Sequence, residues 1–231
     1  MTIIVEKLKK NKLTLIVSLP ENSPELAIVA QEAGADAIKV HLNVHHDASG
    51  THFGTFAEEK ESLIKIIKSV NIPVGIMPGA DEVATESELE ELKNMGFDFL
   101  DIYVQHMPGW MSEVDGLAKI VAIGERYDIE RLMSLDRFGA DAVEASIIPH
   151  EQYGKKLTIG DLQDYITIAV GSPLPVIVPT QKKIDPDEVP LIADSGVKGL
   201  MIGAIVTGKT PESIKNATRL FRKAIDSLSD D

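Results

Sequence analysis

Four stretches of the chain begin with the same short pattern: a glycine, then a polar or charged residue two places later, then an apolar run. They are Gly34-Ala-Asp-Ala-Ile, Gly96-Phe-Asp-Phe-Leu, Gly139-Ala-Asp-Ala-Val and Gly196-Val-Lys-Gly-Leu. Each follows an amphipathic stretch, so the glycine fits the position just past the end of a helix and the apolar run fits a buried strand. The repeat therefore predicts that helix, turn and strand recur along the chain.

Other apolar runs lie between the repeat units and bring the number of expected strands to eight. These runs are Leu13–Leu19, Val74–Met77, Lys119–Ile123 and Val176–Val178. Helical patterns fill most gaps, at Ser23–Ala33, Ala57–Val70, Thr85–Met95, Asp128–Phe138, Ile159–Val170, Asp185–Ser195 and Thr210–Leu228. Alternating helices and near-continuous apolar strands are typical of a parallel sheet covered by helices.

We therefore predict an α/β fold, a (β/α)₈ TIM barrel that residues 1–231 form as a single domain. The fourth helix, near Trp110–Gly116, is expected to be short or irregular. A doubly wound open sheet is the alternative architecture. The short fourth helix would leave a thin place in the outer layer, where a homodimer contact is one prediction.

Composition restricts the classes of function. The chain has no cysteine, which excludes disulfides, thiolate nucleophiles and Cys-ligated metals, and which fits a cytoplasmic location. The formal net charge of −13 argues against nucleic acid and anionic membranes as partners. No apolar run approaches the roughly 18 residues of a membrane span. The opening MTIIVEKLKKNKL lacks the order of a signal peptide, and we expect it to be a short helix that caps the bottom of the barrel.

The repeat also predicts which strand residues face the inside of the barrel. The fourth and sixth places after each glycine are all apolar, as expected of positions that face the helices: Ile38, Val40, Leu100, Ile102, Val143, Ala145, Leu200 and Ile202. Strand alternation then turns the fifth and seventh places inward. The fifth place holds Lys39, Asp101, Glu144 and Met201, and the seventh holds His41, Tyr103, Ser146 and Gly203. Each set is expected to form one interior layer.

Lys39, Asp101 and Glu144 are thus predicted to meet inside the barrel. A structural ion network is one interpretation, but three buried ionisable groups are expensive and barrel interiors are normally aliphatic. Charges near the carboxyl ends of barrel strands are more typical of catalysis, and two carboxylates beside one ammonium separate into an acid and a base. The predicted catalytic residues are Lys39, Asp101, Glu144 and His41. Ser18 and Thr180 extend the polar set.

All six histidines fall at the ends of expected strands or in the loops that follow them. Four lie in the segment His41–His52, which we expect to be a flexible, lid-like loop. A metal site is one hypothesis, with His41, His45, His46, Asp47 and His106 as ligands. The spacing matches no familiar motif, so we predict no metal and no cofactor, and favour substrate contact or proton transfer by one or two histidines.

Two further loops carry aromatic residues at the expected mouth of the barrel. Trp110 is either a platform over the pocket or a packing residue. Tyr153 with Lys155 and Lys156 forms either a second lid or a solvated loop.

The run Gly199-Leu-Met-Ile-Gly203-Ala-Ile-Val-Thr-Gly208 carries the clearest motif. A strand ends at Gly203, a short helix can start at Ala204, and a helix N-terminus with a glycine before it suits a phosphate. The following Thr210-Pro211-Glu212 fits the start of the last helix. A glycine that serves only a tight turn is the alternative.

This segment resembles the phosphate-binding TIM barrels, the superfamily of ribulose-phosphate epimerase and the histidine and tryptophan pathway isomerases, and is nearest in style to N-acetylmannosamine-6-phosphate epimerase. The resemblance implies that Gly203 and Ala204 hold a phosphate. It covers roughly the last fifty residues. The superfamily has a second glycine after the seventh strand, where this chain has Pro179-Thr180-Gln181-Lys182; Thr180 or Lys182 are the candidates to replace it.

Member families of the superfamily place their catalytic groups differently. The mannosamine-phosphate epimerases carry lysine on the third strand and glutamate on the seventh, where this chain has Met77 and Pro179. The keto-acid aldolases carry glutamate on the second strand and a Schiff-base lysine on the sixth, whereas Lys39 and Glu144 have those strands exchanged. The resemblance therefore implies the superfamily and no member family.

Three functions follow as hypotheses. The first is an isomerase or epimerase of a phosphorylated sugar or sugar-like carbonyl compound, in which Glu144 or Asp101 removes a proton, Lys39 stabilises the enolate, and His41 or Tyr103 returns the proton. The second is an aldolase-type carbon–carbon lyase with a Schiff base on Lys39. The third is a non-catalytic regulatory barrel that binds a phosphorylated ligand. The predicted substrate-binding residues are Ser18, Tyr103, Ser146, Thr180, Gly203 and Ala204.

Overall fold

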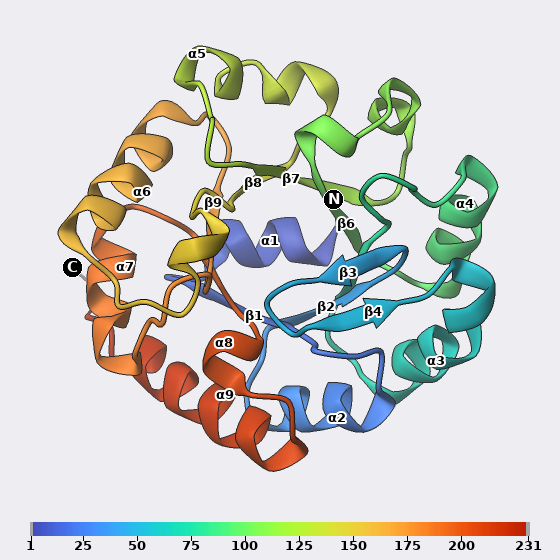
Figure 1. Ribbon diagram of the computed structural model, residues 1–231, viewed down its shortest axis with the longest axis horizontal. Coiled ribbons are helices and arrows are strands. Elements are labelled where there is room, and N and C mark those ends of the chain that lie inside the picture. The colour runs from blue at the N-terminus through green and yellow to red at the C-terminus, as the bar shows by residue number, and fades with distance from the viewer. Residues whose placement is uncertain (1, 230–231) are drawn as a thin grey trace.

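Eight parallel strands close into a barrel in the computed structural model, which describes residues 2–229 (Figure 1). The strands are β1 (Thr14–Ser18), β2 (Ala37–His41), β5 (Val74–Met77), β6 (Phe99–Tyr103), β7 (Ala118–Ile123), β8 (Ala142–Ala145), β9 (Val176–Pro179) and β10 (Gly199–Ile202). The first and last close the ring, with Thr14 paired to Gly199 and Val17 to Ile202. The predicted TIM barrel is confirmed, and the closed ring excludes the open sheet.

The outer layer consists of α2 (Pro24–Glu32), α3 (Phe56–Ser69), α4 (Glu86–Met95), α6 (Ile159–Gly171), α7 (Val189–Asp194) and α9 (Pro211–Asp226), with 3₁₀ turn η5 (Pro186–Glu188) leading into α7. After β6 the chain forms only the 3₁₀ turns η1 (Val104–His106) and η2 (Gly109–Glu113), so the irregular fourth helix is confirmed. No helix within residues 2–229 is long and apolar enough to cross a membrane.

The helix expected at 128–138 is shorter than predicted. It is a single α-helical turn, α5 (Ile129–Leu132), followed by the 3₁₀ turn η3 (Leu135–Phe138). Between them, the Ser134 hydroxyl donates to the carbonyl oxygen of Arg131 at 2.8 Å, and the Ser134 N–H donates to the same oxygen at 3.0 Å. Such local hydrogen bonds compete with the i−4 ladder, which explains why the helix ends early.

Strand alternation sorts the residues as the repeat predicted. The eight apolar residues at the fourth and sixth places all belong to the core between strands and helices. A separate cluster fills the lower barrel, where Ala37, Phe99 and Ala142 at the third place meet helix α1 (Ile3–Lys10). Phe99 occupies space that only a glycine at position 75 leaves open, since a Cβ there would overlap its ring.

Helix α1 closes the bottom of the barrel, as expected. Ile4 and Leu8 are fully buried against the lower cluster. Asp98 accepts hydrogen bonds from the N–H groups of Ile3 (2.8 Å) and Ile4 (2.7 Å) at the start of the helix. Asp98 is the aspartate of the second repeat unit, so the polar position of the repeat holds the start of this helix in place.

The other repeat aspartates bind neighbouring strands. Asp36 accepts from the N–H of Leu15 at 2.9 Å, and Asp141 accepts from the N–H of Lys119 at 2.9 Å. Each aspartate therefore satisfies a backbone donor at the start of an adjacent strand, which explains the polar residue in the pattern.

The segment after β2 differs from the flexible loop expected there. It forms an antiparallel hairpin of β3 (Val44–His46) and β4 (Thr51–Phe53), which lies in front of the barrel strands in Figure 1. The His41 ring is 4.6 Å from that of His46 and 4.7 Å from that of Phe53, centroid to centroid. These tilted ring contacts hold the hairpin against the end of β2.

Candidate functional site

A cavity of about 640 Å³ opens among the carboxyl ends of the strands. Its lining includes most of the residues predicted from the inward register and from the strand ends, namely Ser18, Lys39, His41, Tyr103, Glu144, Ser146, Thr180, Met201 and Gly203. Asp101, 2% exposed, lies beneath this lining, and Ala204 is also outside it. The strand register thus brings the predicted residues to one place, although it does not by itself give them roles.

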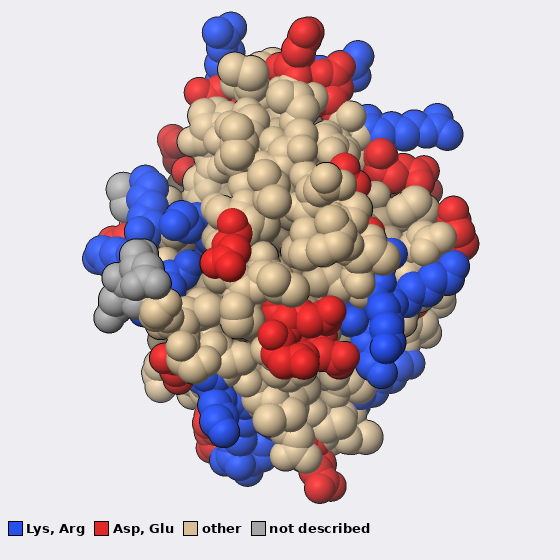
Figure 2. Space-filling view, turned by 90° about the vertical axis from the view of Figure 1, so that its left-hand side faces the viewer, with Lys and Arg blue, Asp and Glu red and all other residues tan. Residues whose placement is uncertain are grey.

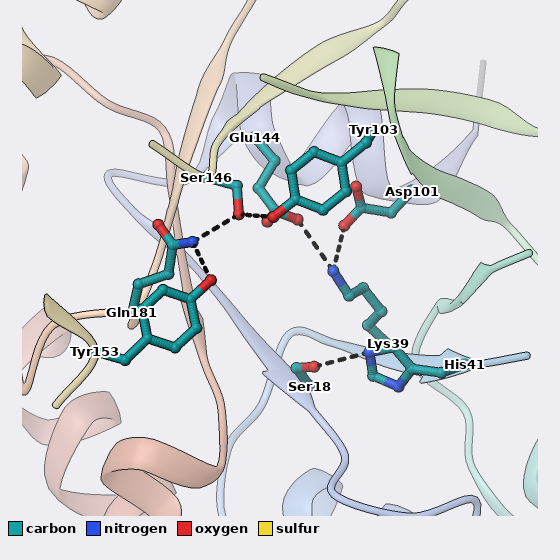
Figure 3. Close-up of polar contacts among 9 residues, drawn as sticks. All are labelled: Ser18, Lys39, His41, Asp101, Tyr103, Glu144, Ser146, Tyr153 and Gln181. Atoms are coloured by element: carbon teal, nitrogen blue, oxygen red, sulfur yellow. Dashed lines mark hydrogen bonds and ion pairs between the residues drawn. The ribbon is translucent and has the colours of Figure 1, made fainter. Parts of the chain in front are cut away.

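Lys39 is at the centre of a buried charge cluster (Figure 3). Its ammonium donates to Asp101 Oδ2 at 2.7 Å and to Glu144 Oε2 at 3.0 Å. The exposed fractions of the three side chains are 9%, 1% and 6%. β2, β6 and β8 supply one residue each, at the same place of the repeat, so the predicted meeting of these three groups is confirmed.

Burial and mutual charge push the two carboxyl groups in opposite directions. Burial, followed by the charge of Glu144, raises the pKa of Asp101 well above its ordinary value. Burial alone would raise the pKa of Glu144, but Lys39 and hydrogen bonds from Asp101 and Ser146 lower it. Burial likewise opposes the charge on Lys39, yet the two carboxyl groups raise its pKa. These opposite shifts favour a charged Lys39, a negative charge on Glu144 and the proton of the carboxyl pair on Asp101.

A chain of hydrogen bonds runs along the β8 side of the cavity (Figure 3). The hydroxyls of Tyr103 and Ser146 are 2.6 Å apart. Gln181 donates from Nε2 to Ser146 Oγ at 3.0 Å and to the Tyr153 hydroxyl at 2.7 Å. Sequence reasoning gave Gln181 no role. It follows β9 in a short irregular segment, and strand periodicity does not extend there.

His41 is fully buried against the hairpin instead of standing free in the cavity. Its Nε2 is 3.4 Å from Ser18 Oγ, and its Nδ1 has no partner within the described chain. Burial, then the charges of His46 and Lys39, lowers the pKa of His41 well below its ordinary value. His41 is therefore neutral at physiological pH.

The residues proposed as metal ligands are not gathered into a metal site. Between residues 2 and 229 no group of three or more His, Cys, Asp or Glu side chains is placed to hold a metal ion. His46 bonds Ser49 through Nδ1 at 2.9 Å, His106 lies 3.8 Å from Asp81, and Asp47 lies 3.4 Å from His150. The histidines are distributed over separate contacts around the mouth.

The predicted phosphate end of the cavity lies where β9 and β10 finish. Gly203 precedes the short helix α8 (Ala204–Thr207), and its N–H donates to Thr180 Oγ1 at 2.9 Å. Lys182, the other candidate to replace the missing glycine, is turned away. It is 5% exposed, pairs with Asp161 of α6 at 3.3 Å and is absent from the cavity lining.

Of the two loops with aromatic residues, one packs against the core and the other lines the cavity. Trp110 is partly buried against the main core and does not line the cavity, which supports the packing interpretation. Tyr153 lines the cavity, whereas Lys155 and Lys156 are exposed. Thr210 caps α9 and accepts from the Ser213 N–H, as its sequence pattern predicted.

Sequence comparison finds no matching protein family and no matching curated protein. Solved structures do match the fold. Thiamine phosphate pyrophosphorylase from Pyrococcus furiosus is 18% identical, with TM-score 0.68 over 94% of this chain and 96% of that chain. Tryptophan synthase from M. tuberculosis is 13% identical, with TM-score 0.74 over 97% and 100%. Phosphoribosyl anthranilate isomerase from Thermus thermophilus is 13% identical, with TM-score 0.66 over 94% and 100%. The chain is thus similar in fold to these barrels.

Proposed function

We propose that the protein is an isomerase or epimerase that acts on a phosphorylated sugar or sugar-like carbonyl compound by carboxylate-mediated proton transfer. The observation that carries the proposal is the contact of Lys39 with Asp101 and Glu144 under a cavity at the carboxyl ends of the strands. Barrels with this fold include a thiamine phosphate enzyme and a phosphoribosyl isomerase, which agrees with a phosphorylated substrate.

Glu144 is the proposed base, because it is ionised and lines the cavity. It takes a proton from a carbon next to the substrate carbonyl, and the electron pair moves onto the carbonyl oxygen. The Lys39 ammonium then stabilises the enolate oxygen, since a fixed charge acts more strongly at this buried position than in water. Asp101 stays protonated and lets Glu144 carry the negative charge alone.

The return of the proton distinguishes an epimerase from an isomerase. Return to the opposite face of the same carbon inverts it. Return to the former carbonyl carbon moves the carbonyl along the chain, provided that the enolate oxygen takes up a proton and the hydroxyl on the neighbouring carbon gives one up. Tyr103 is the better placed of the two predicted donors. Both residues line the cavity, but Tyr103 is partly exposed and hydrogen-bonded to Ser146, whereas His41 is fully buried and held against the hairpin.

The cluster argues against the lyase alternative. A Schiff base requires a neutral amine, whereas Asp101 and Glu144 raise the pKa of Lys39. Borohydride trapping in the presence of substrate tests this directly, since only the lyase mechanism leaves Lys39 modified. A regulatory barrel is the other alternative: Lys39→Ala and Glu144→Ala would then bind ligand as the wild type does.

Phosphate is proposed to bind beside Gly203 and Ala204, at the first turn of α8, where the leading N–H groups have no acceptor inside the helix. The Thr180 hydroxyl accepts from Gly203 N–H and so keeps its own hydrogen for a phosphate oxygen. A thermal-shift panel tests this with sugar phosphates, inorganic phosphate and unphosphorylated sugars. A ligand at a hundredfold excess over its Kd stabilises by about 2.7 kcal/mol. Only phosphorylated compounds should stabilise the wild type, and Gly203→Asp should remove their effect.

Proton transfer is tested by deuterium exchange in D₂O, followed by ¹H NMR on a panel of aldose and ketose phosphates. At least one compound should lose the signal of a proton next to its carbonyl. Glu144→Gln should slow this exchange by about 10²–10⁴-fold, as expected for a general base. The matched control is Glu125→Gln, which removes a more exposed carboxylate of the same cavity lining and should leave the rate near that of wild type. If no compound exchanges, the protein is not an isomerase or epimerase of this class.

A further inference from the structure

Gln181 has a defined orientation that fixes the direction of its hydrogen bonds. Its Oε1 accepts from the backbone N–H of Ile148 at 3.1 Å. A backbone N–H is always a donor, so the oxygen of the side-chain amide must face Ile148 and the nitrogen must face the cavity. Gln181 is 6% exposed, and its environment therefore holds this orientation.

The direction of the Gln181 bonds decides what Tyr153 can do. Gln181 Nε2 donates to the Tyr153 hydroxyl oxygen at 2.7 Å and to Ser146 Oγ at 3.0 Å. Because the Tyr153 oxygen is already an acceptor, its own hydrogen remains to be donated elsewhere. Burial raises the pKa of the Tyr153 phenol, so the hydrogen stays in place at neutral pH. Tyr153 lines the cavity, and this hydrogen is available to a bound molecule.

Tyr153 reaches the site from the opposite side to Lys39 (Figure 3). Lys39 and Glu144 stand on β2 and β8, whereas Tyr153 follows the 3₁₀ turn η4 (His150–Gln152) beyond β8. A molecule that contacts Lys39 with one oxygen therefore presents a different part of itself to Tyr153. A neutral phenolic donor suits a hydroxyl or carbonyl oxygen there.

We propose that Tyr153 donates a hydrogen bond to a hydroxyl or carbonyl oxygen of the bound substrate, and that Gln181 is the positioning residue that makes Tyr153 a donor. Tyr153 would then select substrates with an oxygen substituent at that place, which deepens the function proposed above and rests on it for the nature of the substrate. A substrate analogue without that oxygen leaves the Tyr153 hydrogen and its surroundings unsatisfied.

The direct test is ¹³C NMR of protein labelled at Cζ of its four tyrosines, with Tyr153→Phe to assign the signal. The probes are pentose and hexose phosphates, the free sugars and inorganic phosphate. We expect at least one sugar phosphate to move the Tyr153 signal of the wild type. Gln181→Glu should abolish that response, since the introduced carboxylate accepts the Tyr153 hydrogen. Gln105→Glu makes the same change of charge in the cavity lining, at a residue of η1 that follows β6, and should keep the response.

A double-mutant cycle tests whether Gln181 acts through Tyr153. Tyr153→Phe and Gln181→Leu should each weaken binding of that sugar phosphate by about three- to tenfold, as expected for one hydrogen bond. The double variant should be no weaker than the worse single variant, whereas a merely structural Gln181 gives additive losses. The proposal is overturned if no probe moves the Tyr153 signal, or if the losses add. Deuterium exchange tests the proposed function separately, because a probe can bind and shift the Tyr153 signal without being converted to product.

Discussion

Lys39 compensates the buried negative charge of Glu144, which burial alone would force to be neutral. Lys39→Met keeps a side chain of similar length and removes the ammonium group. One buried partner of a charge cluster is then missing, which typically costs about 3–5 kcal/mol at neutral pH. We expect a loss of that size in the free energy of unfolding at pH 7.5, measured with a chemical denaturant.

The pH dependence of this variant should run opposite to that of a paired carboxylate. In the wild type the pKa of Glu144 is lowered, so its contribution is present above the unfolded pKa and is lost as pH falls. Without Lys39, burial raises the pKa of Glu144 in the folded protein. The folded state of the variant then loses stability as pH rises and Glu144 is forced to ionise. Lys39→Met should thus recover stability at pH 5. The control is Lys119→Met, at a lysine of the same 7% exposure on β7 that pairs with the outward-facing Leu100 of β6. Equal losses at both pH values would show that the cluster does not hold Glu144 ionised.

The β3–β4 hairpin depends on neutral histidines. Burial, then the charge of Lys39, lowers the pKa of His46 to about 4. In the unfolded chain the His46 imidazole takes up a proton near pH 6.5. Between pH 6.5 and 4 the unfolded state therefore binds more protons than the folded state, and the free energy of unfolding decreases as pH falls. A pKa lowered from 6.5 to about 4 corresponds to about 3 kcal/mol of stability. We expect His46→Leu to lose less stability than wild type between pH 7 and pH 4.5 in denaturant unfolding.

Hydrogen exchange locates the same effect within the structure. Amides of the hairpin, such as those of Val44 and Phe53, should lose protection in acid before those of the barrel strands do. His52→Leu is the control, because the His52 side chain lies on the exposed side of the hairpin. If His52→Leu flattens the pH dependence as much as His46→Leu does, the stack of His41, His46 and Phe53 is not the pH-sensitive contact.

Elements that leave a periodic pattern of residues in the sequence were predictable, and elements without such a pattern were not. The glycine repeat gave the inward direction of Lys39, Asp101 and Glu144, because strand alternation fixes every second side chain once one position is known. The hairpin after β2 and the early end of α5 depend on local contacts, such as the ring stack and the Ser134 hydroxyl bond, that leave no periodic trace. Gln181 was missed for the same reason, since its role comes from Ile148 and Tyr153, which are distant in sequence.

The molecule carries a formal net charge of −13, but its charges are unevenly spread. Figure 2 views the side of α6 and α7 and shows a broad area without charged side chains. On α6, Val170 is 82% exposed and Ile166 is 44% exposed. The sequence placed a homodimer contact elsewhere, at the thin outer layer near η2, and that contact stays a prediction. Sedimentation velocity at several protein concentrations would decide whether the chain self-associates.

The two ends of the barrel have different roles: the bottom stabilises the fold, and the carboxyl ends of the strands carry the proposed site. Helix α1 and the lower cluster close the bottom with apolar side chains, and the charged and polar residues of the cavity lie above them. Leu8→Ala removes a fully buried side chain from the bottom, which should lower the free energy of unfolding by about 2–5 kcal/mol. At 25 °C, where the variant remains folded, deuterium exchange per molecule and the Tyr153 Cζ signal should match wild type. Glu144→Gln should instead slow exchange in a protein that is still folded at 25 °C. If Leu8→Ala slows exchange while folded, then the apolar layer also holds Lys39 and its carboxylates in position, and the separation between the two ends of this barrel is incomplete.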